Sequence, residues 1–249
     1  HRDRIQRRFH AAVLADPGLS ADYHALVRER GRFQMRKWLD AAWDKRVEIE
    51  LADAAGTLEA SVPSAARYWP EHAELPHPAE RLRLHRSARL LRDAVVSLAR
   101  EGGICRKQGA LLERALDIDH PVRHFEQAHA ALFTLKGEPR KGLEAAAIGD
   151  ALDLLAEVRR ACQQQNAHED HGRMVRLARV LLRESAAYKR ARGLADMADL
   201  ERCALALLRD STLSGWVQER LDQRIRHVLI DEFQDTSPLQ WHALHAWLA

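Results

Sequence analysis

An apolar run that ends in two adjacent acids is the most informative stretch of the sequence. The run is Arg226-His-Val-Leu-Ile-Asp231, and Glu232 follows it. Three consecutive apolar residues, two of them β-branched, are typical of a parallel strand buried on both faces, so we expect a strand over 226–231. The carboxyl ends of such strands face the crevice in which α/β sheets bind ligands. We therefore expect Asp231 and Glu232 to lie beside a bound ligand.

The chemistry that suits these two carboxylates is magnesium-dependent nucleotide hydrolysis. Asp231 can hold Mg²⁺, usually through water, because Mg²⁺ prefers hard oxygen ligands and keeps part of its hydration shell. Glu232 points to the other side of the strand, where it can orient and deprotonate the water that attacks a γ-phosphate. Many phosphate-loop enzymes share an apolar strand followed by Asp-Glu. The alternative is a surface acidic pair at the end of a strand.

The longer string around the two acids is more specific than the pair itself. Asp231-Glu-Phe-Gln-Asp-Thr-Ser237, followed by Gln240, resembles motif II of the UvrD/Rep-like superfamily 1 DNA helicases. Phe233 and Ser237 resemble the AddA/RecB branch of helicase–nucleases. The resemblance implies that Asp231 serves Mg²⁺ and that Glu232 is the catalytic base. It also implies that Gln234 and Asp235 link the state of the bound ATP to the rest of the motor.

A second resemblance to these helicases lies upstream of motif II. Tyr188-Lys189 and then Asp196-Met-Ala-Asp-Leu200 resemble the segment that the family carries before motif II. Met197 stands where Phe is usual, and this exchange keeps the bulk and the apolar character of the side chain. The resemblance implies that Asp199 shapes the motor core.

The sequence also departs from the helicase pattern. It contains no G-x-x-x-x-G-K-[ST], the loop that cradles phosphates, and the later motifs that supply an arginine finger would lie after Ala249. Both ends look cut from a longer protein. We therefore expect an internal fragment that binds ATP weakly and neither hydrolyses ATP nor unwinds DNA. The parent would couple ATP hydrolysis to translocation on single-stranded DNA and to duplex unwinding in repair or recombination, and a partner nuclease or helicase subunit is compatible with the resemblance.

The rest of the chain reads mostly as helix, because Ala, Leu, Arg and Glu dominate it. The resemblance implies that residues 1–185 are a helical insertion subdomain and residues 186–249 a fragment of a RecA-like α/β motor domain. We expect two helices in 143–192, with a break near Gln163–Gly172, because an unbroken helix would be roughly 75 Å long. The other expected helices cover 2–15, a segment capped by Ser20 that turns Phe33 inward, 79–100, 104–116, 122–135, 197–209 and 213–221.

Composition restricts the remaining classes. No apolar run approaches the length that spans a bilayer, and the formal net charge of +3 permits contact with nucleic acid without demonstrating it. The three cysteines, Cys105, Cys162 and Cys203, are far apart, so we expect neither a zinc ribbon nor a disulfide framework. A reducing, cytoplasmic setting fits this pattern.

Arginines at helical spacing are the candidates for contact with DNA phosphates. One stripe holds Arg81, Arg86, Arg89 and Arg92, and a second holds Arg173, Arg176, Arg179 and Arg183. The alternative for both is a solvated face with acidic partners.

We expect His168-Glu-Asp-His171 to be a surface cluster and not a metal site. The rival to the helicase interpretation is a helical DNA-docking or protein-interaction module with a vestigial motor segment, which would lack a phosphate loop upstream and an arginine-bearing motif downstream.

Overall fold

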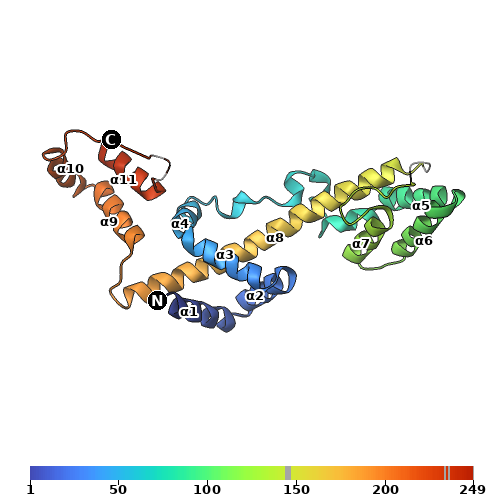
Figure 1. Cartoon of the computed structure of the whole chain (residues 1–249), viewed down its shortest axis with the longest axis horizontal. Coiled ribbons are helices and arrows are strands. Elements are labelled where there is room, and N and C mark those ends of the chain that lie inside the picture. The colour runs from blue at the N-terminus through green and yellow to red at the C-terminus, as the bar shows by residue number, and fades with distance from the viewer. Residues whose placement is uncertain (144–146, 233, 235, 249) are drawn as a thin grey trace. The chain divides into compact units, whose positions relative to one another are not determined.

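The computed structural model describes residues 1–143, 147–232, 234 and 236–248, and helices dominate them (Figure 1). By packing, the chain divides into two compact units: unit 1 is His1–Ser61 with Gly172–Ala249, and unit 2 is Val62–His171. The predicted boundary between residues 185 and 186 concerns domains of the helicase family and stays a prediction. No helix among the described residues is both long and apolar enough to cross a bilayer.

Unit 1 contains helices from both ends of the chain. They are α1 (Arg2–Ala15), α2 (Pro17–Arg30), α3 (Arg32–Asp44), α4 (Arg46–Ala54), the short η1 (Glu59–Ser61), the C-terminal part of α8 (Gly149–Arg190), α9 (Met197–Arg209), α10 (Ser214–Asp222) and α11 (Pro238–Leu248). Apolar residues four apart place Ile5, Phe9 and Val13 of α1 on one face, where they pack with Leu177 and Leu181 of α8.

The second helix of unit 1 differs in detail from the prediction. It begins at Pro17 and not after Ser20, because the Asp16 side chain accepts hydrogen bonds from the backbone N–H groups of Gly18 and Leu19 while Pro17 occupies the first helical position. It ends at Gly31, whose φ of +84° suits glycine and separates α2 from α3. Phe33 follows this break and is exposed, so its predicted inward orientation was wrong.

Unit 2 packs three helices against the N-terminal part of α8. Its elements are η2 (Ala65–Arg67), η3 (Pro70–His72), η4 (Pro78–Arg83), α5 (His85–Arg100), α6 (Gly103–Leu116), α7 (Pro121–Leu132) and the first part of α8. Leu91, Leu112, Leu132 and Leu155 are fully buried in one core. Between residues 56 and 78, where three prolines interrupt the chain before Pro78, the structure forms only 3₁₀ turns.

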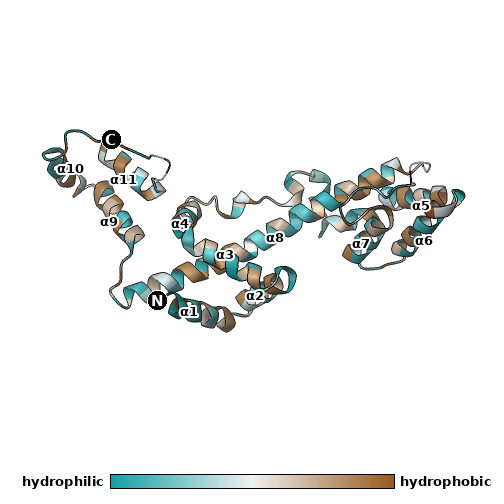
Figure 2. Cartoon of the chain, viewed as in Figure 1, coloured by the Kyte–Doolittle hydropathy of each residue, from teal (hydrophilic) through white to brown (hydrophobic). Residues whose placement is uncertain are grey.

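The predicted break in the long helix was wrong. α8 is a single helix of 42 residues, about 63 Å at 1.5 Å per residue, and polar and apolar residues alternate along it (Figure 2). The polar stretch that suggested a break binds the loop backbone beside it. Gln164 Nε2 donates to the carbonyl of Pro63 at 2.6 Å, and Nδ1 of His168 lies 2.7 Å from the carbonyl oxygen of Val62. These polar side chains hold the loop backbone beside α8.

The predicted strand at 226–231 is also absent. The described residues form no strand, and the one β-bridge among them joins Phe133 to Pro139. Val228 and Ile230 are partly exposed and Leu229 is 95% exposed, and the run has no regular secondary structure. A strand needs a second strand to pair its N–H and C=O groups, and none is available within the described residues. The mostly α-helical fold class is thus confirmed, whereas the RecA-like sheet is not.

Candidate nucleotide and nucleic-acid sites

The motif II segment is extended and open to solvent. Asp231 and Glu232 are both exposed, and the Asp231 carboxylate accepts a hydrogen bond of 2.9 Å from the Glu232 backbone N–H. Glu232 has a φ of +48°, a left-handed conformation that is uncommon outside glycine and often occurs at functional turns. Gln234 Nε2 donates to the Glu232 carboxylate. Asp235, predicted to act with Gln234, lies outside the described residues.

The residues that follow the two acids start α11. Ser237 is the N-cap: its hydroxyl accepts from the Gln240 N–H at 3.1 Å, while the Gln240 side chain accepts from the Ser237 N–H at 3.1 Å. This reciprocal pair is a capping box, which satisfies two backbone donors at the helix start. Both side chains also bind Glu201 of α9, Gln240 at 2.6 Å and Ser237 at 3.2 Å. The Ser and Gln of the motif therefore have a local structural role, which is to begin α11 and fasten it to α9.

The upstream motif forms a second capping box, at the start of α9. The Asp196 carboxylate accepts from the Asp199 N–H at 3.1 Å, and the Asp199 carboxylate accepts from the Asp196 N–H at 2.9 Å. Lys189, from the end of α8, donates to both carboxylates, at 3.1 Å to Asp196 and 2.6 Å to Asp199. The spacing from Lys189 to Asp199 thus brings the ends of two helices together. Asp199 here caps α9 and binds the end of α8, and its expected role in a motor core stays a prediction.

Three residues that the sequence did not indicate complete this network. Arg46 of α4 pairs with Asp196 at 3.3 Å, and Arg202 of α9 pairs with Asp199 at 3.2 Å and with Glu50 of α4. Glu50 and Arg202 are 152 residues apart in the sequence, so no local pattern could have joined them.

The electrostatics of the network favour ionised acids. Burial acts to raise the pKa of Asp196, but the hydrogen bond from Asp199 and the charges of Lys189 and Arg46 outweigh it, so this pKa lies below its ordinary value. The network therefore joins α4, α8 and α9 most firmly when its carboxylates are charged.

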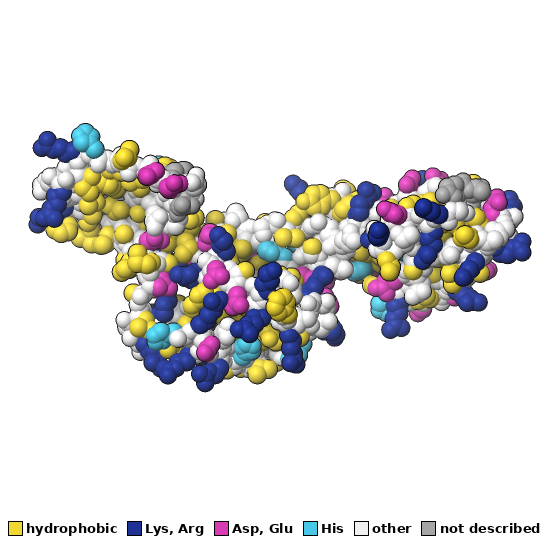
Figure 3. All heavy atoms as spheres, in the orientation of Figure 1, with side chains coloured by type: hydrophobic (Ala, Val, Ile, Leu, Met, Phe, Trp, Pro, Cys, Tyr) yellow, Lys and Arg dark blue, Asp and Glu magenta, His cyan; other side chains and the backbone are white. Residues whose placement is uncertain are grey.

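Apolar side chains cover much of the surface around motif II. Figure 3 shows a hydrophobic surface over the part of the chain that holds α9, α10 and α11. The exposed large apolar residues of this part of the chain include Leu207, Leu213, Trp216, Val228 and Leu229. Exposed apolar surface of this extent marks a contact site more often than a free face.

The first arginine stripe divides into paired and open residues. Arg81 contacts the carboxylates of Glu71 at 3.4 Å and Glu157 at 3.2 Å and is partly buried, so the structure does not leave it open toward a nucleic acid. Arg86, Arg89 and Arg92 are exposed on α5, and Arg89 pairs with Asp93 of the same helix at 3.9 Å.

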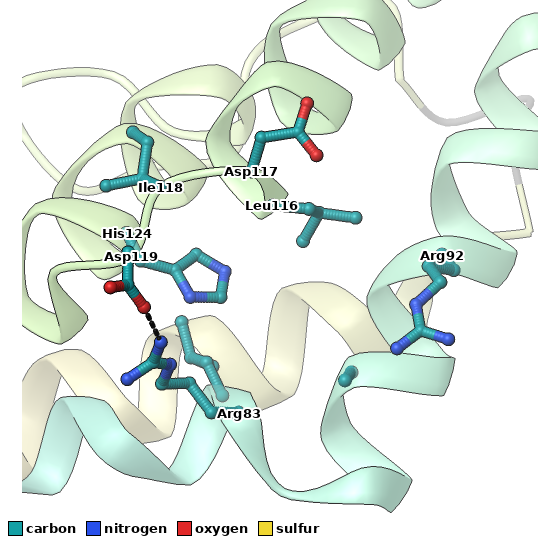
Figure 4. A pocket seen from close by; sticks show the side chains of 9 residues that line it. Arg83, Arg92, Leu116, Asp117, Ile118, Asp119 and His124 are labelled. Atoms are coloured by element: carbon teal, nitrogen blue, oxygen red, sulfur yellow. Dashed lines mark hydrogen bonds and ion pairs between the residues drawn. The ribbon is translucent and has the colours of Figure 1, made fainter.

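A pocket of about 250 Å³ lies beside Arg92 (Figure 4). Arg83 lies in its wall and pairs with Asp119, while Arg92 extends from α5 without touching that pair. His124 also lines the pocket, and burial together with the charge of Arg83 lowers its pKa. The pocket thus presents the Arg92 guanidinium, the Arg83 guanidinium paired with Asp119, and the His124 imidazole.

The second arginine stripe consists of ion-paired residues. Arg176 pairs with Asp22 at 2.7 Å, and Arg179 pairs with Asp53 and Glu59 at 2.6 Å each. The hydrogen bond from Arg179 lowers the pKa of Asp53. These contacts favour the alternative of a solvated, ion-paired face within unit 1.

One comparison with known proteins identifies the family. A family model of the UvrD/REP helicase N-terminal domain matches residues 103–248, from α6 to α11 and more than half of the chain. The chain belongs to the UvrD/REP helicase family. Comparisons with curated proteins and with solved structures gave no match. The family match extends well upstream of the two motifs that carried the resemblance, into the helices of unit 2.

Proposed function

We propose that this chain is part of an ATP-dependent DNA helicase, in which residues 186–249 belong to a RecA-like motor domain and residues 1–185 to its helical insertion. The observation that carries the proposal is the Asp231-Glu232 string within the matched region, preceded by an apolar extended run and followed by a capped helix. Residues 228–230 are exposed and apolar side chains lie around them. This suits a segment that would pair with other strands of a motor sheet.

In this proposal the two acids divide the chemistry of ATP hydrolysis. Asp231 would hold Mg²⁺ through its carboxylate, and the bound ion would neutralise charge on the phosphates. Glu232 would take a proton from the attacking water, and Gln234 would hold the Glu232 carboxylate through the hydrogen bond between their side chains. Asp235 would act with Gln234 in linking hydrolysis to movement. The sequence carries no phosphate-binding loop, so we propose that the chain alone neither binds ATP tightly nor hydrolyses it.

In this proposal, α5 is the helix that contacts DNA. Arg86, Arg89 and Arg92 are exposed on one helix, and guanidinium groups bind phosphate well. The ion pairs of Arg81 remove it from this set.

We also propose a role in repair or recombination, an AddA/RecB-type branch, a partner nuclease or helicase subunit and a cytoplasmic location.

The test is ATP hydrolysis by the longer helicase with and without single-stranded DNA. Glu232→Gln should lower kcat by about 10²–10⁴-fold, because it removes the proton acceptor. The matched control is Glu219→Gln, an exposed glutamate on α10, which should leave kcat unchanged. The 249-residue chain alone should show no hydrolysis.

Two results would contradict the proposal. They are full activity in Glu232→Gln, or steady hydrolysis by the isolated chain that this substitution abolishes. A longer protein that binds DNA but has no ATPase would favour the rival docking module.

A further inference from the structure

Unit 2 holds a compact cluster of four ionisable side chains that the proposed helicase chemistry does not use. Glu71 and His72 come from η3, Arg81 from η4 and Glu157 from α8. Nε2 of His72 lies 3.7 Å from a carboxylate oxygen of Glu157, and Arg81 lies 3.2–3.4 Å from the carboxylates of Glu157 and Glu71. One nitrogen of His72 and one oxygen from each glutamate lie within 4.8 Å of one another.

The imidazole of His72 is the unusual member of this cluster. His72 is 3% exposed, and neither of its ring nitrogens has a hydrogen-bond partner. Among the described residues nine buried side-chain nitrogen or oxygen atoms form no hydrogen bond, and four of them belong to this cluster: both nitrogens of His72, Nε of Arg81 and the Glu157 oxygen that lies 3.2 Å from the Arg81 guanidinium. Buried polar atoms are normally satisfied by protein, water or an ion, so the concentration of unpaired atoms here points to a ligand.

The charges of the cluster also favour a cation. Two carboxylates face one guanidinium, so these three side chains together carry a net negative charge. The imidazole of His72 adds a nitrogen ligand to the two carboxylates, within the same 4.8 Å.

We propose that Glu71, His72 and Glu157 bind one divalent transition-metal ion of the Zn²⁺ class. One imidazole nitrogen and two carboxylate oxygens are ligands that Zn²⁺ accepts, whereas Mg²⁺ and Ca²⁺ take oxygen ligands. Tetrahedral Zn²⁺ with ligands at about 2.1 Å needs ligand atoms about 3.4 Å apart. His72 Nε2 and the Glu157 oxygen are already 3.7 Å apart, all three ligand atoms lie within 4.8 Å of one another, and the Glu71 side chain is 41% exposed.

Arg81 has a different part in this site. Its guanidinium would keep its ion pairs with the two carboxylates and hold them in place, as groups around metal ligands commonly do. It is a positioning residue and not a ligand. The bound ion would fasten the short η3 turn and the loop around it to α8, within unit 2.

The test uses the 249-residue chain after removal of metal by a chelator. One equivalent of Zn²⁺ should raise the Tm by several degrees, and Co²⁺ should give the visible absorption bands of a four-coordinate nitrogen–oxygen site. Glu71→Gln should weaken binding at least about tenfold, and His72→Ala should abolish it. The control, His85→Ala, removes an exposed histidine of α5 and should behave as the wild type.

Each outcome decides for or against the site. Absence of the Tm shift and of the Co²⁺ bands would overturn the proposal, since water alone would then fill the cluster. Binding that persists unchanged in Glu71→Gln would also overturn it, because the ion would then sit elsewhere among the chain's 14 histidines. If His72→Ala does not fold, Glu71→Gln decides alone, since its half-exposed side chain is not needed for packing.

Discussion

Removing the charge of Lys189 tests the network that positions α9 ahead of motif II. Lys189→Met keeps the apolar stem of the side chain and deletes the ammonium group that donates to Asp196 and Asp199. Lys189 is only 15% exposed, so water replaces its bonds poorly. The two carboxylates would then face each other across the capping box with less positive charge between them.

The expected cost follows from these contacts. A hydrogen bond to a charged group contributes about 1.5–3 kcal/mol, and removing one partner of a fully buried pair costs about 3–5 kcal/mol. Both carboxylates are a quarter to a third exposed, and they keep Arg46 and Arg202 as partners. We therefore expect a loss of about 2 kcal/mol, which in a chain of this size lowers the Tm by roughly 4–8 °C.

The assay is urea unfolding followed by tryptophan fluorescence, because five of the six tryptophans lie in unit 1. The control is Lys45→Met, which removes an exposed surface partner of Glu48 and should cost less than about 0.5 kcal/mol. A Lys189→Met protein as stable as the control would refute the reasoning.

Acid should reduce the difference in the free energy of unfolding between Lys189→Met and the wild type. The native pKa of Asp196 is depressed, so its stabilising contribution is complete above the ordinary value of 3.8 and is lost as the pH falls through the native pKa. If the two proteins differed by the same free energy of unfolding at pH values below this range, the stabilisation could not be assigned to ionised Asp196.

Three further predictions concern the core, the helix start after motif II and the α5 surface. Leu155→Ala should destabilise unit 2 by about 2–5 kcal/mol in urea unfolding, because the side chain is fully buried. Ser237→Ala should cost about 0.5–2 kcal/mol and speed hydrogen exchange at the start of α11, because it removes the cap and a bond to Glu201. Reversing the charge of Arg86 and Arg89 should weaken duplex binding by the longer helicase and reduce the salt slope by about 0.9 for each lost phosphate contact.

Matched controls separate these effects from general damage. Leu111→Ala removes a partly exposed leucine of α6 and should cost far less than the Leu155 change. Reversal of Arg4 and Arg7, both exposed on α1, changes the net charge as much as the α5 reversal and should leave the duplex affinity closer to that of the wild type. Equal effects of the paired variants would contradict the corresponding prediction, and unchanged exchange in Ser237→Ala would contradict the cap.

Local patterns predicted the elements whose signals lie within one turn of the chain. The bounds of α1 and α9 agree with the prediction, because apolar spacing defines the first and Asp196 caps the second. The break in α8 was predicted from polar composition alone, and the contact of Gln164 with Pro63 that explains this composition joins residues 101 positions apart. Long-range contacts of this kind leave no local pattern.

The functional residues also divide into those that a local pattern predicts and those that depend on long-range contacts. The motif string identified Asp231 and Glu232, whereas the Arg46 and Arg202 contacts that hold the upstream motif could not be read from their neighbours in the sequence. The prediction of a strand at 226–231 was wrong for another reason. A strand forms only when a second strand pairs with it, and apolar β-branched residues supply only the tendency to pair.

Hydrogen exchange at the backbone of Val228, Leu229 and Ile230 is the most direct test of the central claim. These amides should exchange fast in the 249-residue chain, where no strand is described beside them. They should become strongly protected in the longer helicase, where we propose that they pair within the motor sheet. Fast exchange of all three amides in the longer, ATP-hydrolysing protein would contradict the account.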